Sequence, residues 1–236
     1  MLRARDVIRV HQGHYTVPLE FPRVPHLQGA AIVVTSFLVR HPDGPILLDT
    51  GMASGHEKAE AIFHPQIRSF DDALREMGLK TADVHAIGNC HLHVDHAGNN
   101  FRFPGTPIFI QKAEYLAAGT TLDYSLPDKT IAFPGVKLEV LDGEEGEIAK
   151  GVRVVPTPGH TDGHQSFVVE TQEGRIVIAG QAFNETSDYT RALLAWRLDE
   201  DGQPHPTYAP WVARLQELDP WRVTFAHDLA VWERGA

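Results

Sequence analysis

The distribution of apolar and polar positions along the 236-residue chain predicts alternating short strands and short helices. Residues 31–39 are β-branched and almost continuously apolar, which is typical of a buried strand. A turn signal at residues 41–44 (His-Pro-Asp-Gly) precedes residues 45–49, so we expect these two segments to form a hairpin. Apolar runs predict further strands at residues 107–110, 136–141, 152–155, 165–171, 175–179 and 222–226.

Helical spacing is clearest in residues 69–77, where Phe70, Leu74 and Met77 lie three to four positions apart. Two strand-rich clusters, each with helices attached, indicate two sheets packed together with helices outside. We expect one domain over residues 1–236. Two further helices are predicted at residues 112–118 and 208–218.

Composition and charge exclude several functional classes for this chain. The formal net charge of −10 argues against a nucleic-acid partner, because phosphate binding needs clustered Lys and Arg. Cys90 is the only cysteine, so an intrachain disulfide is excluded and a reducing compartment is permitted. Residues 1–6 lack the apolar core of a signal peptide, and no window approaches the ~20 apolar residues of a membrane span. We therefore expect a cytoplasmic protein that makes no membrane contact.

The densest cluster of reactive side chains is His-Leu-His-Val-Asp-His at residues 91–96. In an extended segment His91 and His93 point to the same side, so they can hold one ion together. Asp95 and His96 follow at the end of this segment and can turn toward a second position. A single histidine is more often a surface or core residue than a ligand, and among 14 histidines some close pairs arise by chance, but this spacing predicts a metal site.

Further ligands must come from elsewhere in the chain. His160 follows the predicted strand 152–155, and a Pro-Gly step lets the backbone turn sharply to present its side chain. His164 lies four positions later, and we favour a structural hydrogen-bonding role for it. His227 ends the predicted strand 222–226 and is included because the second metal position still needs a nitrogen donor.

Four motifs occur along the chain at residues 47–51 (Leu-Leu-Asp-Thr-Gly), 91–98 (His-x-His-x-Asp-His-x-Gly), 157–161 (Thr-Pro-Gly-His-Thr) and 225–228 (Phe-Ala-His-Asp). They resemble those of the metallo-β-lactamase-fold hydrolases, most closely the N-acyl homoserine lactonase group, and the resemblance covers nearly the whole chain. It implies an αββα sandwich, with two mixed β-sheets, outer helices and a metal site at one edge of the sheets.

The resemblance also implies two divalent ions, with zinc favoured and iron, manganese or cobalt as alternatives. Asp95 would in addition orient the nucleophile or carry its proton. Asp49 matches an aspartate that orients the histidine ligands, although a simple strand-end cap is an equal alternative. The implied ligands are His91, His93 and His160 for the first ion, and Asp95, His96 and His227 for the second.

Two positions depart from the resembled lactonases. Where they carry an aspartate that bridges both ions, this chain has Gln181, a neutral amide. The second site would then be weaker, or activity would be lost, or both ions would stay without a bridging carboxylate; we favour the last because the six other ligands are present. Where the lactonases carry a tyrosine near the substrate carbonyl, this chain has Asn184. Tyr189 would replace it from a flexible loop, or be an exposed aromatic without a role.

The predicted reaction is the opening of a lactone, or cleavage of a related ester, by metal-activated water acting on a small-molecule substrate. Residues 21–27, and Phe183 with residues 192–196, would form apolar walls that suit an acyl chain or, equally, a homodimer contact. Hydrolysis of β-lactams, thioesters or phosphodiesters on the same fold is the main alternative. A catalytically silent protein that keeps a metal for stability is the alternative of a different class.

Overall fold

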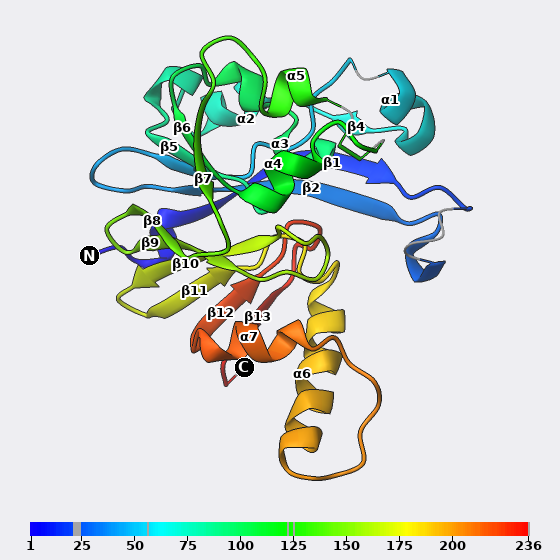
Figure 1. Ribbon diagram of the computed structural model, residues 1–236. Helices are drawn as coiled ribbons and strands as arrows, with labels where there is room; N and C mark the ends of the chain where they lie inside the picture. The colour runs from blue at the N-terminus through cyan, green and yellow to red at the C-terminus, as the bar shows by residue number, and fades with distance from the viewer. Residues whose placement is uncertain (21–24, 56, 122, 125, 236) are drawn as a thin grey trace.

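Two mixed β-sheets pack face to face, and helices cover the outer face of each (Figure 1). The computed structural model describes residues 1–20, 25–55, 57–121, 123–124 and 126–235. The first sheet has the strand order β4-β1-β2-β3-β5-β6-β7. Its strands are β1 (Val7–Thr16), β2 (Ala31–Val39), β3 (Ile46–Leu48), β4 (Gln66–Ile67), β5 (Ala86–Gly88), β6 (Pro107–Gln111) and β7 (Lys137–Leu141).

The second sheet has the order β13-β12-β11-β10-β9-β8. Strands β11 and β12 run parallel, whereas the other neighbours in this sheet are antiparallel. The first sheet is mixed too, because β3, β5, β6 and β7 are parallel and β1, β2 and β3 are antiparallel. The second-sheet strands are β8 (Gly146–Ala149), β9 (Val152–Pro156), β10 (Gln165–Thr171), β11 (Gly174–Ile178), β12 (Pro220–Thr224) and β13 (Val231–Glu233).

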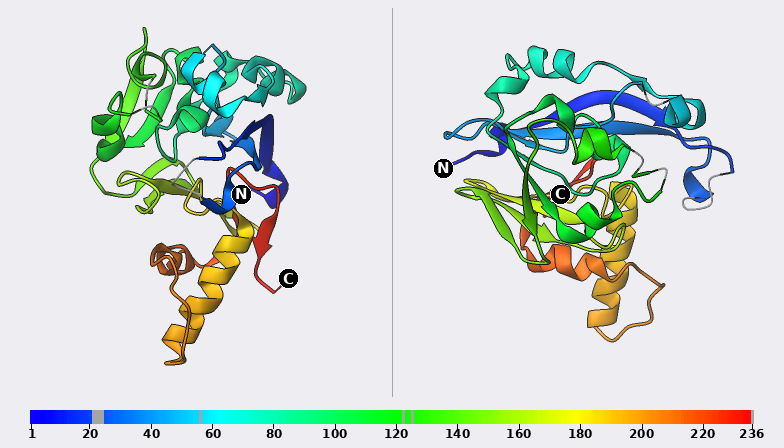
Figure 2. Two further views of the ribbon diagram at one scale, coloured as in Figure 1. Left: turned by 90° about the vertical axis from the view of Figure 1, so that its right-hand side faces the viewer. Right: turned by 45° about the horizontal axis from the view of Figure 1, so that its top comes forward.

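The helices form the two outer layers, as two further views show (Figure 2). The first layer contains α1 (Glu57–Phe63), α2 (Phe70–Glu76), α3 (Val94–Ala97), α4 (Lys112–Ala117) and α5 (Pro127–Thr130). The second contains α6 (Thr186–Glu200), which extends away from the sheets, and α7 (Trp211–Glu217). Short 3-10 turns lie at Ala4–Asp6 (η1), Pro25–Leu27 (η2), Thr81–Asp83 (η3) and Asn100–Arg102 (η4).

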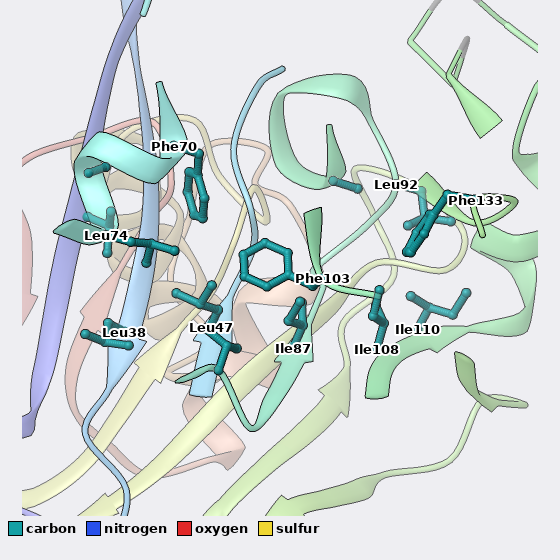
Figure 3. Packing of buried hydrophobic residues seen from close by; sticks show 14 residues of the cluster. Leu38, Leu47, Phe70, Leu74, Ile87, Leu92, Phe103, Ile108, Ile110 and Phe133 are labelled. Carbon is teal, nitrogen blue, oxygen red and sulfur yellow. The ribbon is translucent and has the colours of Figure 1, made fainter. Parts of the chain in front are cut away.

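The alternation of side chains along the central strands produces three hydrophobic layers. On β2, Phe37 points into the layer between the sheets, whereas Leu38 points outward to the layer beneath α2. On β10, Phe167 joins the layer between the sheets and Val168 packs beneath α6 and α7. Figure 3 shows the outer layer of the first sheet, where Phe70 of α2 lies among leucine, isoleucine and phenylalanine side chains. Both sheets are therefore apolar on both faces, as an αββα sandwich requires.

The structure confirms the predicted sandwich and most of its strands, including residues 31–39 and 165–171. The long strand β1 was not predicted, because a bulge between His11 and Gly13 interrupts its period of two. Helix α6 was also missed, and residues 192–196 are helical. None of the helices in the described part of the chain is both long and apolar enough to cross a bilayer.

Candidate metal centre

The carboxyl ends of five strands meet at one edge of the two sheets and carry predicted residues of the site. Asp49 follows β3, His91 follows β5, His160 follows β9, Gln181 follows β11 and His227 follows β12. Parallel strands expose their carboxyl ends at the same edge of a sheet, and β9 has the same direction as β11 because two antiparallel pairings separate them. Segments far apart in sequence thus converge on one place, which is the usual location of ligand sites in mixed sheets.

The first group of side chains is His91, His93 and His160, whose nitrogens lie within 4.8 Å of one another. Nδ1 of His93 and Nε2 of His160 are 3.3 Å apart. Nε2 of His91 is buried and has no hydrogen-bond partner among the residues that the structure describes. Burial, with repulsion from the neighbouring imidazoles, holds the pKa of His91 and of His160 well below the usual value. Both rings are therefore neutral and can offer a nitrogen lone pair to a metal ion. A buried nitrogen without a partner among neutral imidazoles fits a divalent cation.

The second group is Asp95, His96 and His227, and its hydrogen bonds determine which ring nitrogen faces the site. Nδ1 of His227 lies 2.9 Å from the carbonyl oxygen of Val33, which can only accept, so Nδ1 carries the hydrogen. Nδ1 of His96 lies 3.0 Å from Oδ2 of Asp49 and donates to it for the same reason. In their neutral forms both rings therefore direct the lone pair of Nε2 into the site.

Acceptor atoms face one another in this second group. The Nε2 atoms of His96 and His227 are 3.1 Å apart. Oε1 of Gln181 lies 3.1 Å from Nε2 of His96. Oδ2 of Asp95 is 3.7 Å from Nε2 of His96 and 3.5 Å from Nε2 of His227. Four lone-pair atoms at these distances repel one another unless a cation lies between them, so the donor set fits a second divalent ion.

The raised pKa of His96 also indicates that this site favours a cation. Burial acts to lower the pKa of His96, but Asp95 and the hydrogen bond to Asp49 outweigh it and raise that pKa above the usual value. The negative charge of Asp95 thus favours a positive charge at this position. A metal ion supplies that charge when it binds.

Asp49 accepts hydrogen bonds from three groups around the centre. Its Oδ1 accepts from the backbone N–H of Cys90 at 2.8 Å, and its Oδ2 accepts from the Cys90 thiol at 3.0 Å and from His96. The residue has a positive φ of 64°, which aspartate tolerates better than most residues. Asp49 is therefore placed to orient the His96 ring through this hydrogen bond.

His164 has the structural role that the sequence favoured. Its Nδ1 lies 3.0 Å from the carbonyl oxygen of Thr157, and its Nε2 accepts from the backbone N–H of Gln181 at 3.1 Å. Burial lowers the pKa of His164 to about 4, so the ring is neutral at physiological pH. It therefore ties the loop after β9 to the loop after β11.

Glu114 was not predicted as part of the centre, although it is buried and lies in the cavity wall. Its carboxylate accepts from the backbone N–H of Leu92 at 2.9 Å, from the Tyr124 hydroxyl at 3.0 Å and from the Thr161 hydroxyl at 2.6 Å. It joins the loop of His91 and His93 to the loop of His160. No local sequence pattern predicts this role, because the three hydrogen-bond donors come from separate segments of the chain.

A cavity of about 740 Å³ lies above the two groups of ligands. Its polar floor includes His93, Asp95, His160 and Gln181. One apolar wall comes from Val17, Leu27, Ile32, Met52 and Phe63, and the other from Ala182, Phe183, Ala209 and Trp211.

Leu27 and Phe183 are thus where the sequence placed cavity walls, but residues 21–24 lie outside the described residues. Residues 192–196 do not line the cavity, so the prediction that they form one of its walls was wrong: in α6, Leu193 is buried against the second sheet and Leu194 is 54% exposed on the opposite face.

The structure also corrects the expectation for Tyr189. It lies in α6 and is fully buried between the second sheet and α7, with its hydroxyl hydrogen-bonded to Gln216. It is therefore neither on a flexible loop nor exposed. Tyr15 of β1, which was not predicted as a site residue, lines the cavity and hydrogen-bonds to Asp95. Burial and the charge of Asp95 raise the pKa of Tyr15 well above its usual value, so its hydroxyl keeps its proton.

Comparisons with known proteins agree with this geometry. The family model of the metallo-beta-lactamase superfamily matches residues 30–227. The chain is similar to an N-acyl homoserine lactonase from Bacillus sp, with 35% identity over 217 residues that cover 86% of this chain and 83% of the relative. It is also similar to the N-acyl homoserine lactonase AttM of Agrobacterium fabrum, with 31% identity over 72% of this chain and 68% of the relative.

Two solved structures share the arrangement. One is a mutant of B. thuringiensis AiiA with N-decanoyl-L-homoserine bound at the active site, with a TM-score of 0.75, 26% identity and coverage of 97% of this chain and 95% of that chain. The other is an N-acyl homoserine lactone hydrolase with the product N-hexanoyl-L-homoserine bound at the catalytic metal center. It has a TM-score of 0.72, 26% identity and coverage of 94% and 93%.

Proposed function

Because the chain belongs to the metallo-β-lactamase superfamily and, within it, to the N-acyl homoserine lactonases, we propose that it opens the lactone ring of N-acyl homoserine lactones with two divalent ions. The first ion would be held by His91, His93 and His160, and the second by Asp95, His96 and His227. Zinc is our first candidate, since imidazole nitrogen and carboxylate oxygen are its usual ligands besides thiolate.

When bound, such ions supply hydroxide at neutral pH and polarise the ester carbonyl. The side chains then have to orient the substrate and move a proton. The Asp95 carboxylate lies in the cavity floor beside the Nε2 atoms of His96 and His227. In this position it can take the proton of the attacking water and deliver it to the ring oxygen as the ester bond breaks.

The two apolar walls would bind the acyl chain. Phe63 packs edge-on against Tyr15, with ring centroids 5.5 Å apart, and closes one side of the cavity. Trp211 is fixed on the other side, because its Nε1–H donates to the carbonyl oxygen of Ala182 at 2.7 Å. Rigid aromatic walls give an aliphatic chain apolar contact and demand little reorganisation.

A single observation carries the proposal: four lone-pair atoms converge at the floor of a cavity with two apolar walls. Nε2 of His96, Nε2 of His227, Oε1 of Gln181 and Oδ2 of Asp95 face one another with neighbour distances of 3.1–3.7 Å. Such a group supports a hydrolytic metal centre in contact with substrate more than a buried stabilising ion, because the cavity reaches Asp95 and Gln181.

The test is proton release on addition of N-acyl homoserine lactones to protein loaded with zinc or cobalt, followed in a pH-stat. Ring opening liberates an acid, so we expect metal-dependent proton release that a chelator abolishes. A β-lactam, a thioester and a phosphodiester are run in parallel as competing substrates. Metal-loaded protein that turns over one of these and leaves the lactones intact would refute the proposal, and so would protein that turns over none.

His160→Ala is the matched variant for this assay. The substitution removes one of the three nitrogen ligands of the first group, so we expect metal content to fall by one equivalent and lactone turnover to fall with it. His85→Ala is the control, because His85 lies outside both ligand groups. Equal metal content in His160→Ala and in the parent protein would contradict the ligand assignment.

A further inference from the structure

We propose that Gln181 is a fourth ligand of the second ion, binding through its side-chain oxygen, and that Asn184 orients it. The inference rests on the metal centre of the proposed function but is independent of which substrate is hydrolysed. It gives a specific role to a neutral residue at a position where a carboxylate is expected.

The orientation of the Gln181 amide follows from its hydrogen bond to Asn184. Nε2 of Gln181 donates to Oδ1 of Asn184 at 3.0 Å. An amide has one donor end and one acceptor end, so this bond leaves Oε1 to face His96, at 3.1 Å from its Nε2. Asn184 thus selects which atom of Gln181 enters the site.

The main chain at Gln181 is held as firmly as the side chain. Its N–H donates to Nε2 of His164 at 3.1 Å. Gly180 before it has a positive φ of 53°, and a Cβ there would lie 2.5 Å from Cβ of Cys90. The loop after β11 is therefore pressed against the residue that precedes His91, and this contact sets the depth at which Gln181 enters the centre.

The contact between Gln181 and His96 joins two acceptors when His96 is neutral. Nδ1–H of His96 is already donated to Asp49, so its Nε2 presents a lone pair to Oε1 of Gln181. Nε2 of His227 lies 3.1 Å from Nε2 of His96 and presents a lone pair too. A cation between these three atoms replaces the two repulsive contacts with three ligand bonds, and amide oxygen is an established metal ligand in proteins.

This ligand set has a consequence for charge. Among the side chains that we assign to the two ions, Asp95 is the only carboxylate. The loaded centre therefore keeps more positive charge than one with a second carboxylate between the ions. We expect it to bind anions, including the carboxylate formed when a lactone opens, more tightly than the Gln181→Glu variant does.

The experiment is a titration of metal-free protein with cobalt(II), followed by visible absorption, which resolves the equivalents without any measurement of activity. We compare the parent with Gln181→Leu, Gln181→Glu, Asn184→Leu and Asn184→Asp. Gln181→Leu should weaken one equivalent by about ten- to hundred-fold and leave the other unchanged. Gln181→Glu should tighten the same equivalent, because it adds a negative charge at the ligand position.

The two Asn184 variants test the orienting role. Asn184→Leu removes the acceptor for Nε2 of Gln181 and should weaken the same equivalent, whereas Asn184→Asp keeps an acceptor and should preserve its binding. Thermal melting of the metal-free variants checks that each is folded. If Gln181→Leu does not fold, the comparison of Gln181→Glu with the parent tests whether Gln181 binds the second ion.

Equal cobalt affinities in the parent, Gln181→Leu and Gln181→Glu would overturn the inference, as would uptake of a single equivalent by all three. If the affinities change as expected and no lactone is hydrolysed, the ligand assignment stands and the proposed substrate is wrong.

Discussion

Replacement of Asp49 by asparagine should weaken the second metal position selectively. The two oxygens of Asp49 accept from the backbone N–H and thiol of Cys90 and from Nδ1–H of His96. Asparagine keeps the size of the side chain and tolerates the positive φ of 64°, so the backbone should not move. The variant therefore removes one negative charge beside His96 and changes one acceptor atom into a donor.

The magnitude follows from the two orientations open to the new amide. If its NH₂ group faces His96, Nδ1 of that ring must accept, its proton moves to Nε2, and the lone pair that would hold the ion is lost. If its oxygen faces His96, the NH₂ group opposes the buried backbone N–H of Cys90, which costs about 1–3 kcal/mol. Either outcome corresponds to a loss of affinity of about ten- to hundred-fold.

Cobalt titration of the metal-free protein measures this loss directly. Asp49→Asn should bind the first equivalent as the parent does and the second about ten- to hundred-fold more weakly. Asp43→Asn, an exposed aspartate in a turn, is the control and should bind both equivalents normally. If Asp49→Asn keeps parental affinity for both, hydrogen bonding to Asp49 does not set the state of His96.

Three other outcomes can be measured. The folded pKa of His164, about 4, is below the unfolded value near 6.5, so the unfolded chain binds more protons in this range. The free energy of unfolding of metal-free protein in urea should therefore fall by about 3 kcal/mol from this residue as pH drops from about 6.5 to about 4, and a flat profile would contradict this. Tyr15→Phe removes the hydroxyl beside Asp95 and should lower kcat about ten-fold at unchanged metal content; an unchanged kcat would exclude Tyr15 from the reaction. Glu114→Gln should reduce the free energy of unfolding by about 1–3 kcal/mol, because one amide cannot accept from Leu92, Tyr124 and Thr161 together; parental stability would disprove that reasoning.

Much of the fold and of the metal centre could be predicted because their signals are local. The spacing of His91, His93, Asp95 and His96 is visible within six residues, and His160 and His227 each end an apolar run. The structure brings these six side chains into two neighbouring groups, as expected from the sequence.

The parts that could not be predicted depend on contacts between distant segments. Glu114 and Tyr15 reach the centre from α4 and β1, and nothing beside them in the sequence indicates their partners. The error at Tyr189 has a different cause. Tyr189, Ala192 and Leu193 do have helical spacing, but Leu194 and Leu198 place apolar side chains on the solvent face and blur the pattern.

The proposed ligands come from segments that follow strands of both sheets, from His91 after β5 of the first to His227 after β12 of the second. Within the described residues, neither half of the chain holds a complete proposed set for either ion: His160 completes the first group and His227 the second. Metal uptake should therefore report the docking of the two sheets during folding, and bound metal should oppose their separation. At a free concentration one hundred times Kd, each ion would add about 2.7 kcal/mol to the free energy of unfolding. Metal availability in the cell would then set how long the folded protein persists as well as how fast it works.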